Sequence, residues 1–234
     1  MRRFGRIYAS AVLRPLAEQL VAELDVRLES RIVDVMCDGG TASTEVRRQC
    51  AGAGIILVDT TREALADAIA AVDAGGSVEA LLTNGSTLPL ADATCDAAMS
   101  LLTLGFGEPQ ALYSEMRRVV HRGGRIVSLS WAAEPPAHER ILIDAYQDAV
   151  GSPPAYAAAF QSTPQFGEGR AVRDVVRFDG AHQYWDAVLS HRGLNGHPSL
   201  HEIRARGGEL LGEYTAADGT IRIPIELTMV AQDV

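Results

Sequence analysis

The sequence predicts an α/β fold, built around one mostly parallel sheet with helices packed on it. The first observation behind this prediction is that short apolar runs alternate with amphipathic stretches from residue 31 onward, as they do in repeated βα units. The second is that 47% of the 234 residues are hydrophobic, which is enough for a domain with a sizeable buried core. We therefore expect residues 1–234 to form a single domain.

Apolar runs predict the strands in chain order. The parallel part of the sheet is expected to consist of RIVDVM (31–36), GIILVD (54–59), VEALLT (78–83), CDAAMSL (95–101) and GRIVSLSW (124–131). Two later segments, 171–178 and 220–231, alternate or run apolar in the manner of a closing antiparallel pair.

Amphipathic stretches predict helices over 41–53, 61–74 and 108–121. The pattern is clearest in the last, because Leu112 and Met116 recur on one face and glycines at 123 and 124 supply a stop.

Two flanking regions do not show this alternation of apolar runs and amphipathic stretches. Residues 1–29 predict an N-terminal helical cap, in which Pro15 begins a helix with Leu16 and Leu20 on its apolar stripe. Residues 132–170 contain Pro pairs and Ala-rich turns, which predict a helical insertion that acts as a lid.

Composition limits the partners that we expect. A formal net charge of -9 and a pI near 5.1 disfavour nucleic acid and anionic membranes, and leave a small-molecule substrate as the expected partner. A homodimer stays an open alternative. Charged residues interrupt every apolar run, and Arg14 and Pro15 end the N-terminal one, so a cytoplasmic protein is expected. Three cysteines without CxxC spacing and scattered histidines indicate neither a disulfide framework nor a metal site.

Four stretches in register resemble the class I S-adenosylmethionine-dependent methyltransferase family, particularly its small-molecule branch. They are VDVMCDGGT (33–41), the strand end LVD (57–59), TNGSTLPL (83–90) and EMRRVVHRGGRIV (115–127). The resemblance implies a Rossmann-like fold with a mostly parallel seven-stranded sheet, an antiparallel closing strand and helices on both faces. It also implies S-adenosylmethionine as the cofactor, with no metal.

The resemblance assigns candidate cofactor contacts residue by residue. The first strand and its turn supply Asp34, Met36, Asp38 and Gly40, while Asp59 would hydrogen-bond the ribose hydroxyls. In the 83–90 segment, Asn84 would meet the adenine amino group through its side-chain oxygen. Two of these residues also have structural interpretations, because an Asp at a strand end often caps the next helix and Asn-Gly is a common turn dipeptide.

Met36 and Asp38 stand where the family has glycines. A methionine side chain would occupy space that the methionine and ribose portions of the cofactor need. The Asp38 carboxylate would face the cofactor carboxylate, and two like charges about 4 Å apart repel by ~4 kcal/mol at a surface-like dielectric. We expect these two residues to oppose cofactor binding.

His138, Tyr8 and Trp131 are the candidate catalytic residues. His138 follows the fifth predicted strand, near Glu134 and Glu139, and its alternative interpretation is a solvated helix residue. The two aromatic residues belong to a wider set that would line an apolar pocket, for which ordinary core packing is the alternative. That set also contains Phe106, Tyr146, Tyr156, Phe160, Phe166, Tyr184 and Trp185. His121 is expected to interact with carbonyls at a helix end.

Three functions remain open. The first is an enzyme of methyltransferase fold that cyclises or isomerises a small, largely apolar natural-product-like substrate by holding a reactive conformer. The second is a small-molecule O- or C-methyltransferase, in which His138 or water would take the substrate proton. The third is a non-catalytic binding partner.

Overall fold

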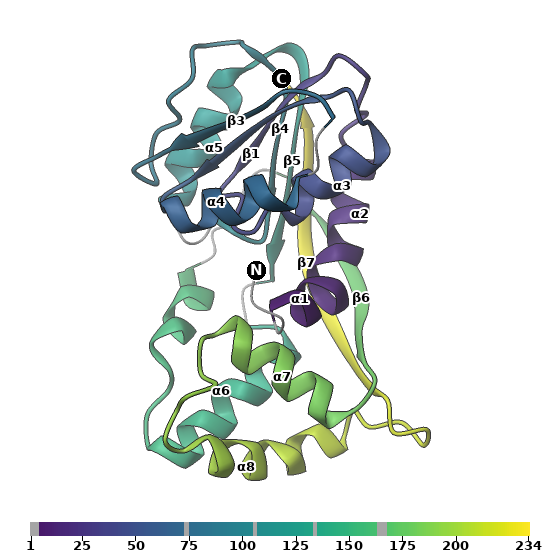
Figure 1. Cartoon of the computed structure of the whole chain (residues 1–234), viewed down its shortest axis with the longest axis vertical. Helices are drawn as coiled ribbons and strands as arrows, with labels where there is room; N and C mark the ends of the chain where they lie inside the picture. The colour runs from purple at the N-terminus through teal and green to yellow at the C-terminus, as the bar shows by residue number, and fades with distance from the viewer. Residues whose placement is uncertain (1–4, 73–74, 105–106, 133–134, 163–167) are drawn as a thin grey trace. The chain divides into compact units, whose positions relative to one another are not determined.

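The computed structural model describes residues 5–72, 75–104, 107–132, 135–162 and 168–234. Its strands form one seven-stranded sheet in the order β3-β2-β1-β4-β5-β7-β6 (Figure 1). The bounds are β1 Arg31–Val35, β2 Gly54–Asp59, β3 Val78–Leu82, β4 Cys95–Leu101, β5 Val120–Trp131, β6 Arg170–Phe178 and β7 Ile221–Asp233. All seven predicted strands are present, and the predicted α/β fold is confirmed.

The strands from β3 to β5 pair in parallel. In the centre of the sheet, Val33 pairs with Ile56 of β2 and with Ala98 of β4. Parallel strands are buried on both faces, which explains why β1, β2 and β4 are nearly continuous apolar runs. Their carboxyl ends therefore lie at one edge, where α/β folds bind ligands.

β7 runs against β5. Near one end of the pair Val234 accepts from the N–H of Gly123 and donates to Gly124, and near the other the N–H of Ala132 donates to Glu226. Residue numbers rise along one strand as they fall along the other, which is the antiparallel relation. The expected antiparallel closing strand is thus present.

The chain divides into two compact units. The sheet unit comprises Leu13–Ser130, Thr163–Ala171 and Thr228–Val234, and the helical unit comprises Met1–Val12, Trp131–Ser162 and Val172–Leu227. The strands β5, β6 and β7 contribute residues to both. We describe each unit by itself, and the expectation of a single domain stays a prediction.

The described residues of the sheet unit include the helices α2 Arg14–Ala22, α3 Thr41–Gln49, α4 Arg62–Ala71 and α5 Pro109–Val119. α3 and α4 lie in front of the sheet in Figure 1 and α5 lies behind it, so helices cover both faces as expected. A buried apolar core joins α5 to the strands, with Val33, Ile56, Leu112, Met116 and Ile126 among its members.

Three helices end earlier than predicted. α3 stops at Gln49, where buried Arg47 donates to the carbonyls of the following turn, including that of Ala53 at 2.8 Å. α4 spans Arg62–Ala71, within the predicted 61–74. α5 stops at Val119 because Val120 is already extended and begins β5, so the glycines at 123 and 124 interrupt a strand and do not end the helix.

The helical unit contains α1 Gly5–Tyr8, α6 Ala137–Val150, a 3₁₀ helix Ala155–Ser162, α7 Ala181–His191 and α8 Leu200–Gly212. α6 and the 3₁₀ helix fall in the predicted helical insertion 132–170, whose role as a lid stays a prediction. α7 and α8 are not among the predicted helices. No helix within the described ranges has both the length and the apolar character needed to cross a bilayer.

Candidate functional site

The turn after β1 has left-handed backbone at three alternate positions. The φ angles of Met36, Asp38 and Gly40 are 58°, 46° and 74°. Asparagine and aspartate tolerate this region and glycine adopts it freely, but a methionine there is strained. These are the residues aligned with glycines of the family motif, so the turn keeps a glycine-like backbone without two of its glycines.

The side chains of Met36 and Asp38 lie in different surroundings. Met36 is 4% exposed and belongs to the apolar core of the sheet unit, together with Leu88 and Leu104 from the loops after β3 and β4. Asp38 is exposed. The structure therefore shows Met36 packed within the protein, while its predicted conflict with a cofactor stays a prediction.

Gly40 is required by helix packing. It begins α3, and a Cβ at this position would stand 2.9 Å from the Cα of Ala68 on α4. That approach is too close for any side chain, so α3 and α4 need a glycine here whether or not a ligand binds.

Both carboxylate oxygens of Asp59 are engaged within the sheet unit. Oδ2 accepts the N–H of Asp38 at 3.0 Å, and Oδ1 accepts the N–H of Thr61 at 3.2 Å. Thr61, and not Asp59, caps α4, since its hydroxyl accepts the N–H of Ala64. Asp59 thus joins the turn after β1 to the turn after β2, which corrects the interpretation of Asp59 as a helix cap.

The side-chain oxygen of Asn84 holds its own turn. It accepts the N–H groups of Ser86 and Thr87 and both of their hydroxyls, each at 3.0 Å. An amide oxygen has two lone pairs, so four donors leave it no capacity for another. The structural interpretation of Asn84-Gly85 as a turn fits this geometry.

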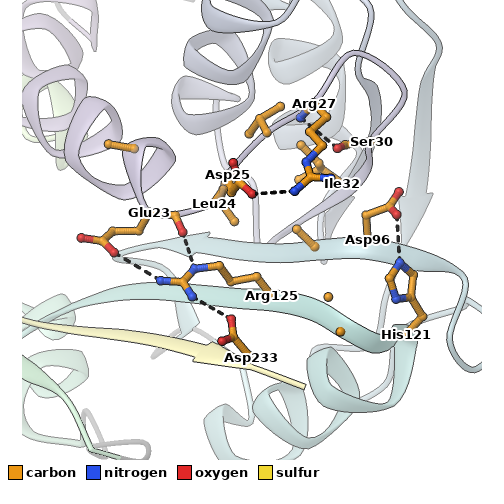
Figure 2. A pocket seen from close by; sticks show the side chains of 15 residues that line it. Glu23, Leu24, Asp25, Arg27, Ser30, Ile32, Asp96, His121, Arg125 and Asp233 are labelled. Atoms are coloured by element: carbon orange, nitrogen blue, oxygen red, sulfur yellow. Dashed lines mark hydrogen bonds and ion pairs between the residues drawn. The ribbon is translucent and has the colours of Figure 1, made fainter.

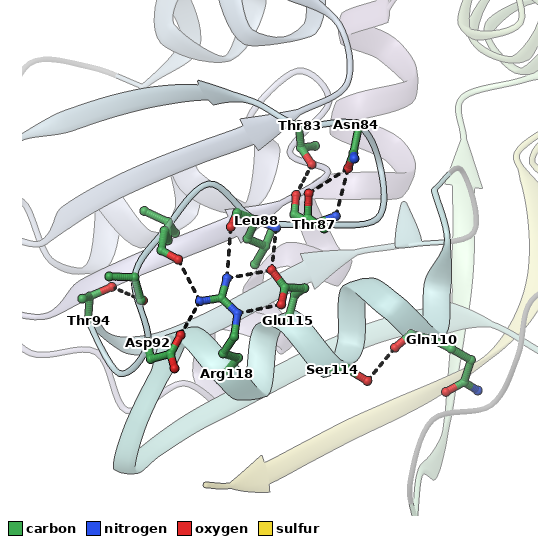
Figure 3. A network of polar contacts seen from close by, with 12 residues as sticks. Thr83, Asn84, Thr87, Leu88, Asp92, Thr94, Gln110, Ser114, Glu115 and Arg118 are labelled. Carbon is green, nitrogen blue, oxygen red and sulfur yellow. Dashed lines mark hydrogen bonds and ion pairs between the residues drawn. The ribbon is translucent and has the colours of Figure 1, made fainter.

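The rest of the 83–90 segment is fastened to α5 (Figure 3). Glu115 accepts the N–H of Leu88 at 2.8 Å, and the Arg118 guanidinium binds the Glu115 carboxylate through two nitrogens at 2.6 and 2.7 Å. Arg118 also donates to the carbonyls of Leu88 and Leu90. The EMRR stretch of the sequence therefore fixes this loop in place.

Burial changes the acidity of Asp34. Removal from water raises the pKa of this carboxyl to about 7, against the effect of the Ser43 hydroxyl, which donates to it at 2.6 Å. The nearby charges of Asp59 and Asp38 raise it further. The carboxyl groups of Asp34, Asp38 and Asp59 therefore lie close together around the turn after β1, and their charge disfavours the binding of another anion there. Among the described residues, no His, Cys, Asp and Glu side chains are grouped so that they could hold a metal.

The three predicted catalytic residues come together in the helical unit. The Tyr8 hydroxyl lies 3.1 Å from Nε2 of His138, and the Trp131 and His138 rings are 5.3 Å apart between centroids. Tyr8 and His138 are buried, so the interpretation of His138 as a solvated residue is wrong. Their catalytic role stays a prediction.

Two charged residues complete this cluster. The Tyr8 hydroxyl donates to Glu139 at 3.1 Å, and the Arg192 guanidinium binds both oxygens of that carboxylate, at 2.7 and 3.1 Å. Glu139 is expected near His138, but Arg192 is not among the predicted site residues, because the helix that ends beside it, α7, is not predicted. We call these four residues, Tyr8, His138, Glu139 and Arg192, the polar cluster.

Burial and charge set the protonation states of the polar cluster. Burial lowers the pKa of His138 to about 4, so the imidazole is neutral near pH 7. Burial works to raise the pKa of Glu139, but the Arg192 charge outweighs it and holds that pKa below its usual range. Burial and the Glu139 charge raise the pKa of Tyr8 well above its usual value. At neutral pH the cluster therefore contains one ion pair and two neutral side chains.

The other aromatic candidates divide between packing and polar contacts. Tyr184 and Trp185 pack edge-on in the core of the helical unit, while Tyr156 lies under the Arg192 guanidinium and Tyr146 contacts His197. Phe106, Phe166 and the side chain of Phe160 lie outside the described residues. A common pocket for the set stays a prediction.

A cavity of about 460 Å³ lies at the opposite ends of the strands from the turns described above (Figure 2). Arg125 pairs there with Glu23 and Asp233, and His121 pairs with Asp96 at 2.9 Å. His121 also contacts a carbonyl, that of Arg122, but from within β5, so the expected helix-end position is wrong. Ligands of α/β folds bind at the carboxyl ends of the strands, so this cavity is not the expected cofactor site.

Comparison with known proteins gives one family match. Residues 33–128 match the family described as "Methyltransferase domain". The uncharacterized protein Rv1403c of Mycobacterium tuberculosis is 33% identical over 128 residues, which cover 54% of this chain and 46% of that protein. The chain thus spans about half the length of the curated relatives it matches.

Solved structures share the fold. A protein of Anabaena variabilis, named as a candidate methyltransferase of an antibiotic biosynthesis pathway, superposes with a TM-score of 0.63 at 16% identity, over 92% of this chain and 96% of that one. The [4+2]-cyclase SpnF superposes with a TM-score of 0.54 at 16% identity, over 94% and 81% of the two chains. At such identities these likenesses show the fold alone. Together with the family match, they confirm the resemblance to class I methyltransferases.

Proposed function

On the premise that residues 33–128 match the methyltransferase-domain family, we propose that this chain is an enzyme of methyltransferase fold that does not transfer methyl groups. Its substrate would be a small, largely apolar molecule, and its reaction a cyclisation or an isomerisation. The single observation that carries the proposal is that the oxygens expected to bind the ribose and adenine of S-adenosylmethionine are already engaged by the protein itself.

The side-chain oxygen of Asn84 has no acceptor capacity left for the adenine amino group. An adenine amino group needs an acceptor, and the Asn84 oxygen already accepts four donors. To release the oxygen, the turn would have to break hydrogen bonds to its own backbone, at a cost of about 1 kcal/mol for each.

The acceptor capacity that Asp59 can offer a ribose is reduced. A bidentate contact to two ribose hydroxyls needs both oxygens of Asp59. Oδ1 already accepts the N–H of Thr61 and, at 3.5 Å, its hydroxyl, whereas Oδ2 accepts only the N–H of Asp38 and keeps one lone pair free. If Asp59 turned toward a ribose, the N–H groups of Asp38 and Thr61 would lose their partner. Asp59 and Asn84 therefore offer the cofactor fewer free acceptors than the family pattern requires.

The helical unit supplies features that suit conformer positioning. His138 and Trp131 bring one polar ring and one apolar ring together, and Tyr8 holds the imidazole from another side. A site of this kind accelerates a unimolecular reaction by restricting the substrate to a reactive geometry and by placing a few hydrogen bonds on it.

Methyl transfer is the second candidate, and the backbone of the turn after β1 favours it. Left-handed φ angles at Met36, Asp38 and Gly40 match the three glycine positions of the family motif. Strained backbone persists where the surroundings impose it, and it is concentrated at functional sites. The left-handed backbone at Met36 therefore supports a turn that faces a ligand.

Calorimetric titration of the whole chain with S-adenosylmethionine separates the two candidates. The proposal expects no binding tighter than the millimolar range, and a micromolar dissociation constant would overturn it in favour of methyl transfer. S-adenosylhomocysteine, titrated in parallel, shows whether the transferable methyl group and the sulfonium charge affect the result.

A double variant, Met36→Gly with Asp38→Gly, provides the matched comparison. It restores the family's glycines and leaves Asp59 and Asn84 unchanged. If the hydrogen bonds of those two residues prevent binding, the variant stays without affinity. A gain in affinity of a hundredfold or more would show that the two side chains are the obstruction.

A further inference from the structure

His138 has a ring nitrogen without a partner. Its Nδ1 atom is fully buried and makes no hydrogen bond within the described part of the chain. Buried polar atoms are nearly always paired, so this exception asks for an explanation. The other ring nitrogen, Nε2, faces the Tyr8 hydroxyl at 3.1 Å.

The polar cluster determines which nitrogen carries the proton. Glu139 is held by the Arg192 guanidinium at 2.7 and 3.1 Å and is ionised, so it can only accept. Tyr8 must then give its one hydroxyl proton to Glu139, at 3.1 Å. The Tyr8 oxygen is left to accept, and the donor that faces it is Nε2–H of His138.

The consequence falls on Nδ1. A neutral imidazole carries one N–H, and a Tyr8 oxygen that gives its proton to Glu139 requires this N–H to be on Nε2. Nδ1 therefore presents a lone pair and cannot donate. The backbone of His138 is fixed as well, since the Tyr184 hydroxyl donates to its carbonyl at 2.6 Å.

We propose that Arg192, Glu139 and Tyr8 position His138 as the Nε2–H tautomer, so that Nδ1 accepts a hydrogen bond from a hydroxyl or N–H group of a ring-containing small molecule. The neighbouring Trp131 ring, 5.3 Å away, supplies an apolar surface for the body of such a ligand. Since His138 has no exposed surface in this structure, the donor reaches Nδ1 only when the surrounding side chains move.

The His138 imidazole accepts a hydrogen bond from the ligand and orients the donor group. Because burial holds its pKa at about 4, the imidazole is a weak base and stays neutral near pH 7. It can therefore orient a donor without removing its proton, which suits conformer positioning. The identity of the ligand rests on the proposed function, whereas the tautomer does not.

Nitrogen NMR of the chain labelled with ¹⁵N-histidine tests the tautomer directly. Two-bond ¹H–¹⁵N correlations at pH 7 distinguish a protonated from an unprotonated ring nitrogen. Loss of a signal in His138→Gln assigns the ring, and ring-to-backbone correlations assign it independently. We expect protonated Nε2 and unprotonated Nδ1, and the reverse pattern overturns the inference.

Two tyrosine variants test the positioning. Tyr8→Phe removes the acceptor of Nε2–H, and we expect the His138 signals to shift toward a mixture of tautomers. Tyr184→Phe is the matched control, because it removes an equally buried hydroxyl that donates to the His138 carbonyl and leaves the contact between Tyr8 and Nε2 in place. Equal tautomer populations in the wild-type chain and Tyr8→Phe would contradict a positioning role. If Tyr8→Phe does not fold, the wild-type spectrum still decides the tautomer.

The ligand part is tested with 2-naphthol, a flat apolar molecule with one hydroxyl donor. We expect it to shift the Nδ1 signal of His138, and 2-methoxynaphthalene, which lacks the donor, to leave that signal in place. No shift with 2-naphthol up to its solubility limit overturns the ligand part. Micromolar binding of S-adenosylmethionine would overturn the proposed function and leave the tautomer result unaffected.

Discussion

The Asp59 carboxylate accepts the backbone N–H of Asp38 at 3.0 Å, and this contact ties the turn after β1 to the end of β2. Its second oxygen holds Thr61, the residue that caps α4. One buried side chain thus organises two of the turns that meet at the carboxyl edge of the sheet. Asp59 therefore has a structural role in the sheet unit. A ligand can use only the acceptor capacity that these hydrogen bonds leave.

Asp59→Ala is therefore expected to destabilise the protein by about 2 kcal/mol, because two backbone donors lose their acceptor. Urea unfolding followed by circular dichroism measures the change. Glu63→Ala, an exposed substitution in the first turn of α4, is the control and should stay within about 0.5 kcal/mol of the wild type. A change of that small size in Asp59→Ala would show that its hydrogen bonds contribute little.

Replacement of Met36 tests the strain in the same turn. Glycine adopts a φ of 58° without penalty and alanine does not, so Met36→Gly should be more stable than Met36→Ala by about 1 kcal/mol. Both variants lose the buried methionine side chain, so their comparison isolates the backbone. Met116, buried in the middle of α5, is the control, since in a helix the order must reverse and Ala should exceed Gly by about 1 kcal/mol. The same order at both positions would mean that Met36 is not strained.

Asp34→Asn tests the raised pKa of this buried carboxyl. The folded-state pKa of about 7 lies above the ordinary value of 3.8, so the folded protein holds this proton more tightly than the unfolded chain. Stability from this group is present at low pH and is lost as pH rises toward 7, by an amount on the order of 4 kcal/mol. The asparagine keeps an acceptor for Ser43 and has no charge to bury. We expect the variant to gain stability relative to the wild type at pH 8 compared with pH 5, and an equal difference at both values would contradict the shift.

The fold could be predicted because its signals are local. Each predicted strand is a short apolar run, and parallel strands buried on both faces are apolar throughout, as Val33 and Ile56 show. Helix ends were less predictable, because α3 ends where Arg47 finds carbonyls that lie beyond it in the chain. That contact depends on three-dimensional packing.

The candidate site was predictable only in part. Tyr8 and Trp131 could be grouped with His138 from the expected topology, and the structure brings the three together. Arg192 could not be predicted as a member of the site, because its ion pair with Glu139 joins residues that are 53 positions apart in the chain. The sequence also does not show that the side-chain oxygens of Asn84 and Asp59 accept hydrogen bonds from nearby backbone N–H groups, because these contacts depend on the turn conformation.

The buried histidine gives the helical unit a pH dependence of the opposite sign to that of Asp34. The folded-state pKa of His138, about 4, lies below the ordinary 6.5, so on acidification the unfolded chain binds this proton first. Its contribution is complete above about pH 6.5 and is lost as pH falls toward 4, by an amount on the order of 3 kcal/mol. Both tryptophans, Trp131 and Trp185, belong to the helical unit, so tryptophan fluorescence during urea unfolding reports on this part of the chain.

His138→Gln removes the titrating ring and should flatten this dependence. Subtracting the stability of the variant from that of the wild type at each pH cancels groups remote from His138, such as Asp34, and leaves the contribution of His138 together with its effect on its neighbours His191 and Glu139. The difference should grow by about 3 kcal/mol in favour of the wild type between pH 4 and pH 7, because only the wild type regains a neutral imidazole over that range. A difference that stays constant with pH would show that His138 titrates alike in the folded and unfolded chains, and would contradict its burial as a neutral side chain held by Tyr8.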